Sequence, residues 1–179
     1  GVPDAAKLAT CDVVLLNHYR AEPTAEQLAA IQAYYRAGKP VVGTRKASHA
    51  YQNWLAIDRE VFGAKYGGHF FERRAEQTVF VEPTAKDSPL VKGVGSAMCG
   101  GGLYTYTELA PDLEVLMSGG PPGKAMPVTW ARVNKGRNDQ RVFYTRYDPE
   151  DVATHADVRD MVVRALFWAA GKDAATYRK

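Results

Sequence analysis

A strand, a helix and a second strand follow one another near the start of the chain, and this order constrains the fold most. Residues 12–16 end in a continuous apolar run, which is typical of a strand buried on both faces. Thr24 begins a capping-box sequence, and apolar residues recur at helical spacing as far as Gly38, which predicts a helix from about 24 to 37. Residues 41–42 start the next strand. The pattern predicts a right-handed βαβ unit with two parallel strands.

Polar and ionisable residues directly follow both of these strands. Asn17 and Tyr19 come after the first strand, and Arg45, Ser48 and His49 come after the second. Parallel strands joined by a crossover end at the same edge of the sheet, and open α/β folds bind their ligands at that edge. We therefore expect these side chains to lie close together and to form the functional part of the molecule.

The remaining sequence predicts further elements with turn-rich connections. Apolar periodicity predicts a helix over about 50–62 and a last helix over about 156–170. Residues 66–69 and 99–102 are rich in glycine and are expected to be loops. Strands are expected at 78–81, 113–117, 128–133 and 141–145. The last two are predicted to form a hairpin, and the whole pattern favours an α/β fold with an open, mostly parallel sheet.

The length of 179 residues suits one domain. We expect residues 1–171 to form it and residues 172–179 to be a solvated tail. The chain starts at Gly1 with neither an initiator Met nor a signal-peptide segment, so we interpret this start as processed or truncated. Cys11 and Cys99 lie far apart, which indicates neither a disulfide framework nor a zinc ribbon. Cytoplasmic and exported locations both stay open.

The charge and the hydropathy of the chain argue against two classes of partner. Lys and Arg number 23 against 20 Asp and Glu, and a formal charge of +3 gives little support for nucleic-acid binding. No apolar run approaches the roughly 20 residues of a membrane span. We therefore expect neither a nucleic acid nor a membrane as a partner, and formation of a homo-oligomer stays open.

The histidines and one arginine are the main candidates for chemistry. His49, His69 and His155 lie in predicted loops or at element ends, as does His18. Imidazole titrates near neutrality and its neutral form binds divalent metals, so these positions suit acid/base catalysis or metal ligation. The alternative is that each is only a surface or hydrogen-bonding residue. Arg45 would present its donors to carboxylate, phosphate or sugar oxygens, or would form a buried ion pair.

Several common reaction classes lack their sequence motifs. The turn at Gly43 carries neither Gly-x-Ser-x-Gly nor Gly-x-Cys-x-Gly, which disfavours cysteine-based amidotransfer. The adjacent Ser48 and His49 give only weak support for a serine hydrolase, because sequence adjacency provides no orienting carboxylate. Neither a dinucleotide fingerprint nor a phosphate loop is present, so no nucleotide cofactor is predicted.

Tyrosines gather near the predicted strand ends and loops, and Tyr19, Tyr104 and Tyr147 are among them. Aromatic faces with hydroxyl tips can stack on sugar rings and bond their hydroxyl groups. The alternative is that these side chains fill the seams between the sheet and the helices.

A series of short motifs runs in order along almost the whole chain. They are residues 12–16, 38–43, Arg45 with 48–50, Trp54, 62–63 with 67–69, 88–90 with Gly93, 103–104, 127–130, 141–144 and 165–169. In this order they resemble the trehalose-utilisation (ThuA-like) family. The resemblance implies a fold similar to class I glutamine amidotransferases, a flavodoxin-like sheet with helices on both faces. It also implies that the family's usual first strand is missing before Gly1.

The resemblance implies a role in sugar metabolism, on a keto-glycoside or a related disaccharide, without glutamine amidotransferase activity. It carries over four site residues by motif: Arg45, His49, His69 and Tyr104.

The chain departs from the family pattern after Tyr144, where residues 145–148 replace an expected Gly-His pair. His155, in the next predicted loop, is the substitute candidate. We assign substrate contacts to residues at strand ends and in loops: Asn17, Tyr19, Ser48, Tyr147 and His155.

Three hypotheses follow for the function. The first is a carbohydrate-active enzyme in which His49 or His69 acts as acid or base while Arg45 or Tyr104 polarises a carbonyl. The second is a non-catalytic sugar-binding or interaction module of a larger exported protein. The third uses His49 and His69 as ligands of a divalent metal such as zinc, with Glu72 as a third ligand.

Overall fold

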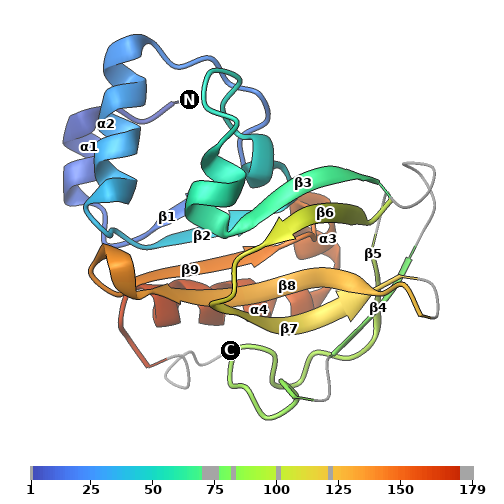
Figure 1. The fold of residues 1–179 in the computed structure, drawn as a ribbon. Coiled ribbons are helices and arrows are strands. Elements are labelled where there is room, and N and C mark those ends of the chain that lie inside the picture. Colours follow the sequence, from blue (N-terminus) through green and yellow to red (C-terminus); the bar gives the residue numbers. More distant parts are fainter. Residues whose placement is uncertain (1, 70–76, 82–83, 100–101, 121–122, 174–179) are drawn as a thin grey trace.

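The computed structural model describes residues 2–69, 77–81, 84–99, 102–120 and 123–173. These residues form one large sheet and a smaller two-stranded sheet (Figure 1). The large sheet has the order β1-β2-β9-β8-β7-β4-β5. Its strands are β1 (Val14–Leu16), β2 (Val41–Thr44), β4 (Gln77–Val81), β5 (Ala97–Cys99), β7 (Leu113–Gly119), β8 (Met126–Asn134) and β9 (Gln140–Thr145). The small sheet pairs β3 (Ala64–His69) with β6 (Tyr104–Leu109).

The large sheet is mixed, with its parallel part at the β1 edge. β1 pairs with β2 in parallel, β2 pairs with β9 in parallel, and each further pair from β9 to β5 is antiparallel. β1, β2, β9, β7 and β5 therefore point in one direction, whereas β8 and β4 run against them. The open, mostly parallel α/β sheet, the βαβ unit and the β8–β9 hairpin are all confirmed.

Helices cover both faces of the sheet, as expected. α1 (Ala5–Thr10) and α2 (Ala25–Arg36) lie on one face, whereas α4 (Ala156–Ala169) lies on the other, preceded by the short α3 (Pro149–Thr154) (Figure 1). Successive strand residues alternate between the two cores: Val41 and Tyr144 pack on the α2 side, and Val42 and Phe143 pack on the α4 side. Both faces are apolar because both are covered.

Local signals set the ends of α2. The hydroxyl of Thr24 accepts a hydrogen bond from the backbone N–H of Gln27 at 3.2 Å, and the Gln27 side chain accepts from the Thr24 N–H at 2.9 Å. After the helix, Gly38 has a φ of +77°, which favours glycine. The predicted helices over 24–37 and 156–170 are therefore confirmed to within one or two residues.

The predicted helix over 50–62 is wrong over most of its length. The structure has a 3₁₀ turn, η1 (Arg45–His49), and a π-helical turn, η2 (Asp58–Phe62), with turns between them. The Ala21 N–H donates to the Ala50 carbonyl at 2.7 Å, and the Gln52 N–H donates to the Ala21 carbonyl at 2.9 Å. These bonds to the segment after β1 replace helical bonds. Of the apolar residues that suggested a helix, Leu55 is exposed and the others are buried in the core: Tyr51, Trp54, Val61 and Phe62.

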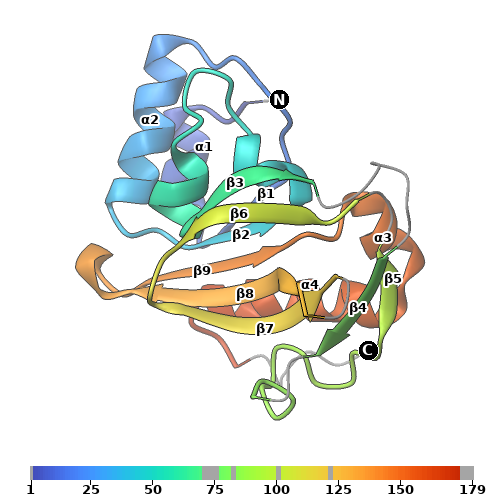
Figure 2. The same ribbon diagram turned by 45° about the vertical axis from the view of Figure 1, so that its right-hand side comes forward.

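The small sheet corrects a second expectation. Residues 66–69 were expected to be a loop, but they belong to β3, which pairs with β6 through a shifted register. Figure 2 shows this ribbon on the face of the large sheet that also carries α1 and α2. Residues 100–101 of the other expected loop, and 174–179 of the expected tail, lie outside the described residues. None of the described helices is long and apolar enough to cross a membrane.

Candidate functional site

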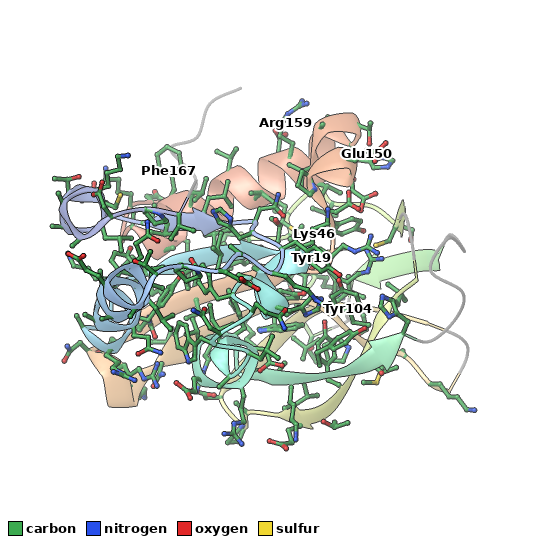
Figure 3. The ribbon with its side chains drawn as sticks, turned by 90° about the horizontal axis from the view of Figure 1, so that it is seen from above. Tyr19, Lys46, Tyr104, Glu150, Arg159 and Phe167 are labelled. Carbon is green, nitrogen blue, oxygen red and sulfur yellow. The ribbon has the colours of Figure 1, made fainter. Side chains whose placement is uncertain are left out.

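A cavity of about 760 Å³ lies at the carboxyl ends of the parallel strands. Its wall combines the segments after β1, β2 and β9 with side chains of η2, β3 and β6. In Figure 3, seen from above, Tyr19, Lys46 and Tyr104 gather near the centre of the molecule, where these segments meet. The β3–β6 ribbon thus forms one side of the cavity, and the segments that follow strands of the large sheet form the other.

The structure brings most of the sequence-predicted site residues to this cavity. Those in its wall are Tyr19, Arg45, Ser48, His49, His69 and Tyr104. The other candidates lie elsewhere: Asn17 is exposed and outside the cavity wall, and His155 joins α3 to α4. Tyr147 is fully buried in the core on the α4 side and is not part of the cavity wall.

Arg45 stands directly after β2 in a strained backbone conformation. Its φ is +20°, which is rare for a residue with a side chain and is typical of functional turns. Its Nη1 atom lies 3.0 Å from Asp148 Oδ2, and its guanidinium carbon lies 5.7 Å from the centroid of the Tyr104 ring. Arg45 therefore lines the cavity and also forms a part-buried ion pair, and its role in ligand binding stays a prediction.

Ser48 contacts both the Arg45 carbonyl and the His49 ring. When the Ser48 hydroxyl donates its one proton to the Arg45 carbonyl at 3.1 Å, the His49 Nδ1–H donates to Ser48 Oγ at 2.9 Å. This tautomer places the lone pair of the neutral ring on Nε2. Burial, together with the positive charges of Arg20, His69 and Arg45, lowers the pKa of His49 to about 4. His49 is therefore a neutral base at neutral pH.

His69 and Tyr104 face each other across the ribbon and form an aromatic cluster with Tyr66. His69 and Tyr104 are register partners, and their rings meet edge to face at 5.0 Å. His69 Nδ1 lies 2.8 Å from the Tyr66 hydroxyl. The His49 ring packs against the same two tyrosines, at 4.8 Å from Tyr66 and 5.6 Å from Tyr104. Both imidazoles therefore share one aromatic wall.

Among the cavity residues that the sequence analysis did not assign to the site are Asp148, Asp58 and Tyr66. Asp148 pairs with Arg45 and also caps α3, where it accepts the N–H groups of Glu150 and Asp151. Its capping-box sequence before Pro149 was the available signal. Tyr66 belongs to the group of tyrosines near predicted strand ends and loops, whereas Asp58 had no local signal.

Asp58 joins η2 to the ribbon. Its carboxylate accepts the Tyr66 N–H at 2.9 Å and the Arg59 N–H at 2.6 Å, and burial raises the pKa of Asp58.

The metal hypothesis stays a prediction. Both imidazoles line the cavity, and their Nδ1 atoms already contact hydroxyl groups. Among the described residues, no group of three or more His, Cys, Asp or Glu side chains is arranged to hold a metal ion. The expected third ligand, Glu72, lies outside those residues.

An open α/β sheet with a cavity at the carboxyl ends of its parallel strands, and a strained residue directly after β2, defines a protein of the class I glutamine amidotransferase-like fold. The chain belongs to the ThuA family, described as trehalose utilisation, whose sequence profile matches residues 3–169. Its membership connects it with carbohydrate metabolism and confirms the resemblance found in the sequence.

Solved structures support the fold. A protein described as ThuA-like from Bacteroides uniformis has a TM-score of 0.66 and 16% identity, and the match covers 96% of this chain and 76% of that one. A second such protein, from Parabacteroides merdae, has a TM-score of 0.66 and 18% identity, with 96% and 74% covered. A protein described as a GMP synthase subunit, from Thermoplasma acidophilum, has a TM-score of 0.60 and 15% identity, with 95% and 78% covered. No curated protein sequence matches the chain.

Proposed function

We propose that the cavity binds a small carbohydrate and acts on a keto-glycoside or related disaccharide by acid/base chemistry. One observation carries this proposal: Arg45, His49, His69 and Tyr104 line the same cavity, in a member of a trehalose-utilisation family. A guanidinium and two imidazoles in a cavity of this size suit a substrate of one or two sugar rings.

The proposed chemistry begins with proton transfer to His49. A carbonyl in a sugar ring acidifies the hydrogen on the neighbouring carbon, and Nε2 of His49 carries the lone pair that accepts it. The electrons of the broken C–H bond move towards the carbonyl oxygen as a C=C bond forms. Arg45 then stabilises the negative charge on that oxygen, because its guanidinium is fixed before the reaction by Asp148.

His69 completes the proposed reaction on the other side of Tyr104. The enolate electrons then re-form the carbonyl, a C=C bond forms to the next carbon, and the bond from that carbon to the glycosidic oxygen breaks. His69 in its protonated form, in the same wall, gives the leaving oxygen its proton, so the products are an unsaturated keto-sugar and a free alcohol. Aromatic side chains support the sugar ring, since Tyr19 and Tyr66 also line the cavity and can pack on its C–H faces. The proposed reaction requires that His49, as the base, and His69, as the acid, both reach the same sugar ring of the substrate.

The test replaces His49 with Gln. We expect His49→Gln to lower turnover of keto-disaccharides by about 10²- to 10⁴-fold, as for loss of a general base, with little change in the free energy of unfolding. Product formation is followed by NMR over a panel of neutral keto-disaccharides. His18→Gln is the matched control, because His18 packs on Tyr51 outside the cavity wall.

Two results would count against the proposal. Unchanged turnover in His49→Gln would reject His49 as the base. Sugar binding without any product in the unsubstituted protein would favour the non-catalytic sugar-binding module instead.

A further inference from the structure

The cavity wall carries more positive than negative side chains. Its cationic residues are Arg20, Arg45, Lys46, Arg59 and Lys65. Its carboxylates are Asp58 and Asp148. The chain as a whole is almost balanced, with 23 Lys and Arg against 20 Asp and Glu, so this excess is local. A cavity lined mainly by one sign of charge concentrates ligands of the opposite sign.

The two carboxylates in the wall are already engaged. Asp148 contacts Arg45 at 3.0 Å and accepts two backbone N–H groups at the start of α3. Asp58 accepts the backbone N–H groups of Arg59 and Tyr66. Both therefore have structural partners that hold them in place.

The cationic residues divide into two groups. Arg45 is paired with Asp148, and Arg59 and Lys65 both contact Glu108, at 3.9 and 2.9 Å. Arg20 and Lys46 differ, because neither forms an ion pair within the part of the chain that the structure describes. Their charges are the ones that a ligand can neutralise.

Arg20 and Lys46 both lie close to His49 in the fold, Arg20 through a backbone bond and Lys46 through the η1 turn that it shares with His49. The Arg20 N–H donates to the His49 carbonyl at 3.0 Å, and Arg20 has a φ of +50°, a conformation that residues with side chains rarely adopt. Its guanidinium carbon lies 5.4 Å from the centroid of the Tyr19 ring. Lys46 follows Arg45 in η1 and, like Tyr19, lines the cavity (Figure 3). The two cations therefore line the cavity near the proposed base.

We propose that the sugar accepted by this cavity carries an anionic group, a carboxylate or a phosphate, and that Arg20 and Lys46 bind it. The inference rests on the proposed function only for the sugar part of the ligand. The low pKa of His49, which Arg20 helps to lower, agrees with a positive potential at this point.

Isothermal titration calorimetry on the whole chain tests this specificity. The ligands are glucose and trehalose as neutral sugars, gluconate and glucuronate as sugar acids, and glucose 6-phosphate. We expect an anionic sugar to bind about tenfold more tightly than the neutral ones, as for one charge-assisted hydrogen bond, and this preference to shrink as salt is raised from about 0.05 to 0.5 M.

Charge-removing variants locate the anion. Arg20→Gln and Lys46→Gln are each expected to weaken binding of the anionic sugar about tenfold and to leave binding of neutral sugars unchanged. Arg159→Gln and Lys92→Gln are the matched controls, because both residues are exposed and outside the cavity wall. Circular dichroism checks that each variant is folded, and the two variants test the site independently.

The outcomes separate this inference from the proposed function. Preference for sugar acids alone identifies a carboxylate, and preference for glucose 6-phosphate alone identifies a phosphate. Equal binding of neutral and anionic sugars, or equal losses in the control variants, would overturn the inference while neutral keto-disaccharides are still turned over. An anion preference that depends on Arg20 or Lys46, without turnover of any keto-sugar, would support the inference and reject the catalysis. If the protein binds none of these sugars and turns over no keto-disaccharide, both the anion site and the proposed catalysis are rejected.

Discussion

Two arginines at equivalent places in the sheet have opposite environments. Thr44 at the end of β2 pairs with Thr145 at the end of β9, so Arg45 and Arg146 follow matched positions on neighbouring parallel strands. Their guanidinium carbons lie 5.7 and 5.4 Å from the centroid of the Tyr104 ring. Arg45 faces the cavity and contacts Asp148, whereas Arg146 is fully buried.

The partners of the two side chains explain the difference. Arg146 donates to the Gly102 carbonyl from Nη2 at 2.7 Å and from Nε at 3.2 Å, and its Nη1 lies 3.1 Å from Cys99 Sγ. These contacts connect β9 to the segment that leads into Tyr104. Arg45 instead has a strained backbone and an acidic partner beside open space. The comparison teaches that one side of Tyr104 is held by buried hydrogen bonds, whereas the other opens onto the cavity where we propose binding and chemistry.

The largest expected effect would come from removing the buried arginine. Arg146→Met leaves the Gly102 carbonyl without its donors and does not refill the guanidinium volume, so we expect the free energy of unfolding to fall by about 3 kcal/mol. Urea denaturation measures the loss. Arg159→Met, at an exposed position on α4, should stay within about 0.5 kcal/mol of the unsubstituted protein. A loss at Arg146 below about 1 kcal/mol would break the comparison.

The cavity arginine should show the reverse result. We expect Arg45→Met to lower turnover about a hundredfold, as for loss of one preorganised donor. The free energy of unfolding should change by less than about 1 kcal/mol, since the ion pair is only part-buried beside the cavity and Asp148 keeps its bonds at the start of α3. Steady-state kinetics and urea denaturation on the same preparation give both numbers. If Arg45→Met lost much of its stability but kept normal turnover, Arg45 would have the structural role that we assign to Arg146.

The smallest expected effect is a dependence on pH that sharpens the description of the cavity side. Because the pKa of His49 is about 4, its base form should persist as pH falls below 6.5, and turnover should decline only as pH approaches 4. A decline centred near 6.5 would contradict the low pKa.

The same pKa also sets a trend in stability. Between pH 6.5 and 4 the unfolded chain binds a proton at His49 more readily than the folded chain does, so the contribution of His49 to stability is lost as pH falls through this window. Urea denaturation at several pH values should show a smaller decrease for His49→Gln than for the unsubstituted protein. Identical decreases would mean that His49 does not carry the trend.

Local sequence patterns predicted the parts of the fold whose signals are contained within one element. The capping box at Thr24, the stop at Gly38 and the apolar strands on either side predicted β1, α2 and β2, and the structure has all three. Parallel connection then places the ends of those strands at one edge. This is why the sequence predicted that Arg45 and His49 would lie near each other.

Non-local contacts decided the rest. The segment after Ala50 has helical periodicity, yet its backbone bonds to Ala21, and Tyr147 turns into the core on the α4 side although it follows a strand end. Neither outcome can be inferred from neighbouring residues, because each depends on which distant surface is available to bury an apolar side chain.

The sequence alone therefore determined the α/β class, the family and the edge of the sheet where the cavity lies. Only the tertiary structure decided that Asp148, 103 residues away in the chain, would hold Arg45, and that the β3–β6 ribbon would bring His69 to His49. The spacing of apolar residues predicts which face of a helix or strand is buried, but it does not predict which other element covers that face. Burial is non-directional, so the identity of that partner emerges only when the whole chain packs.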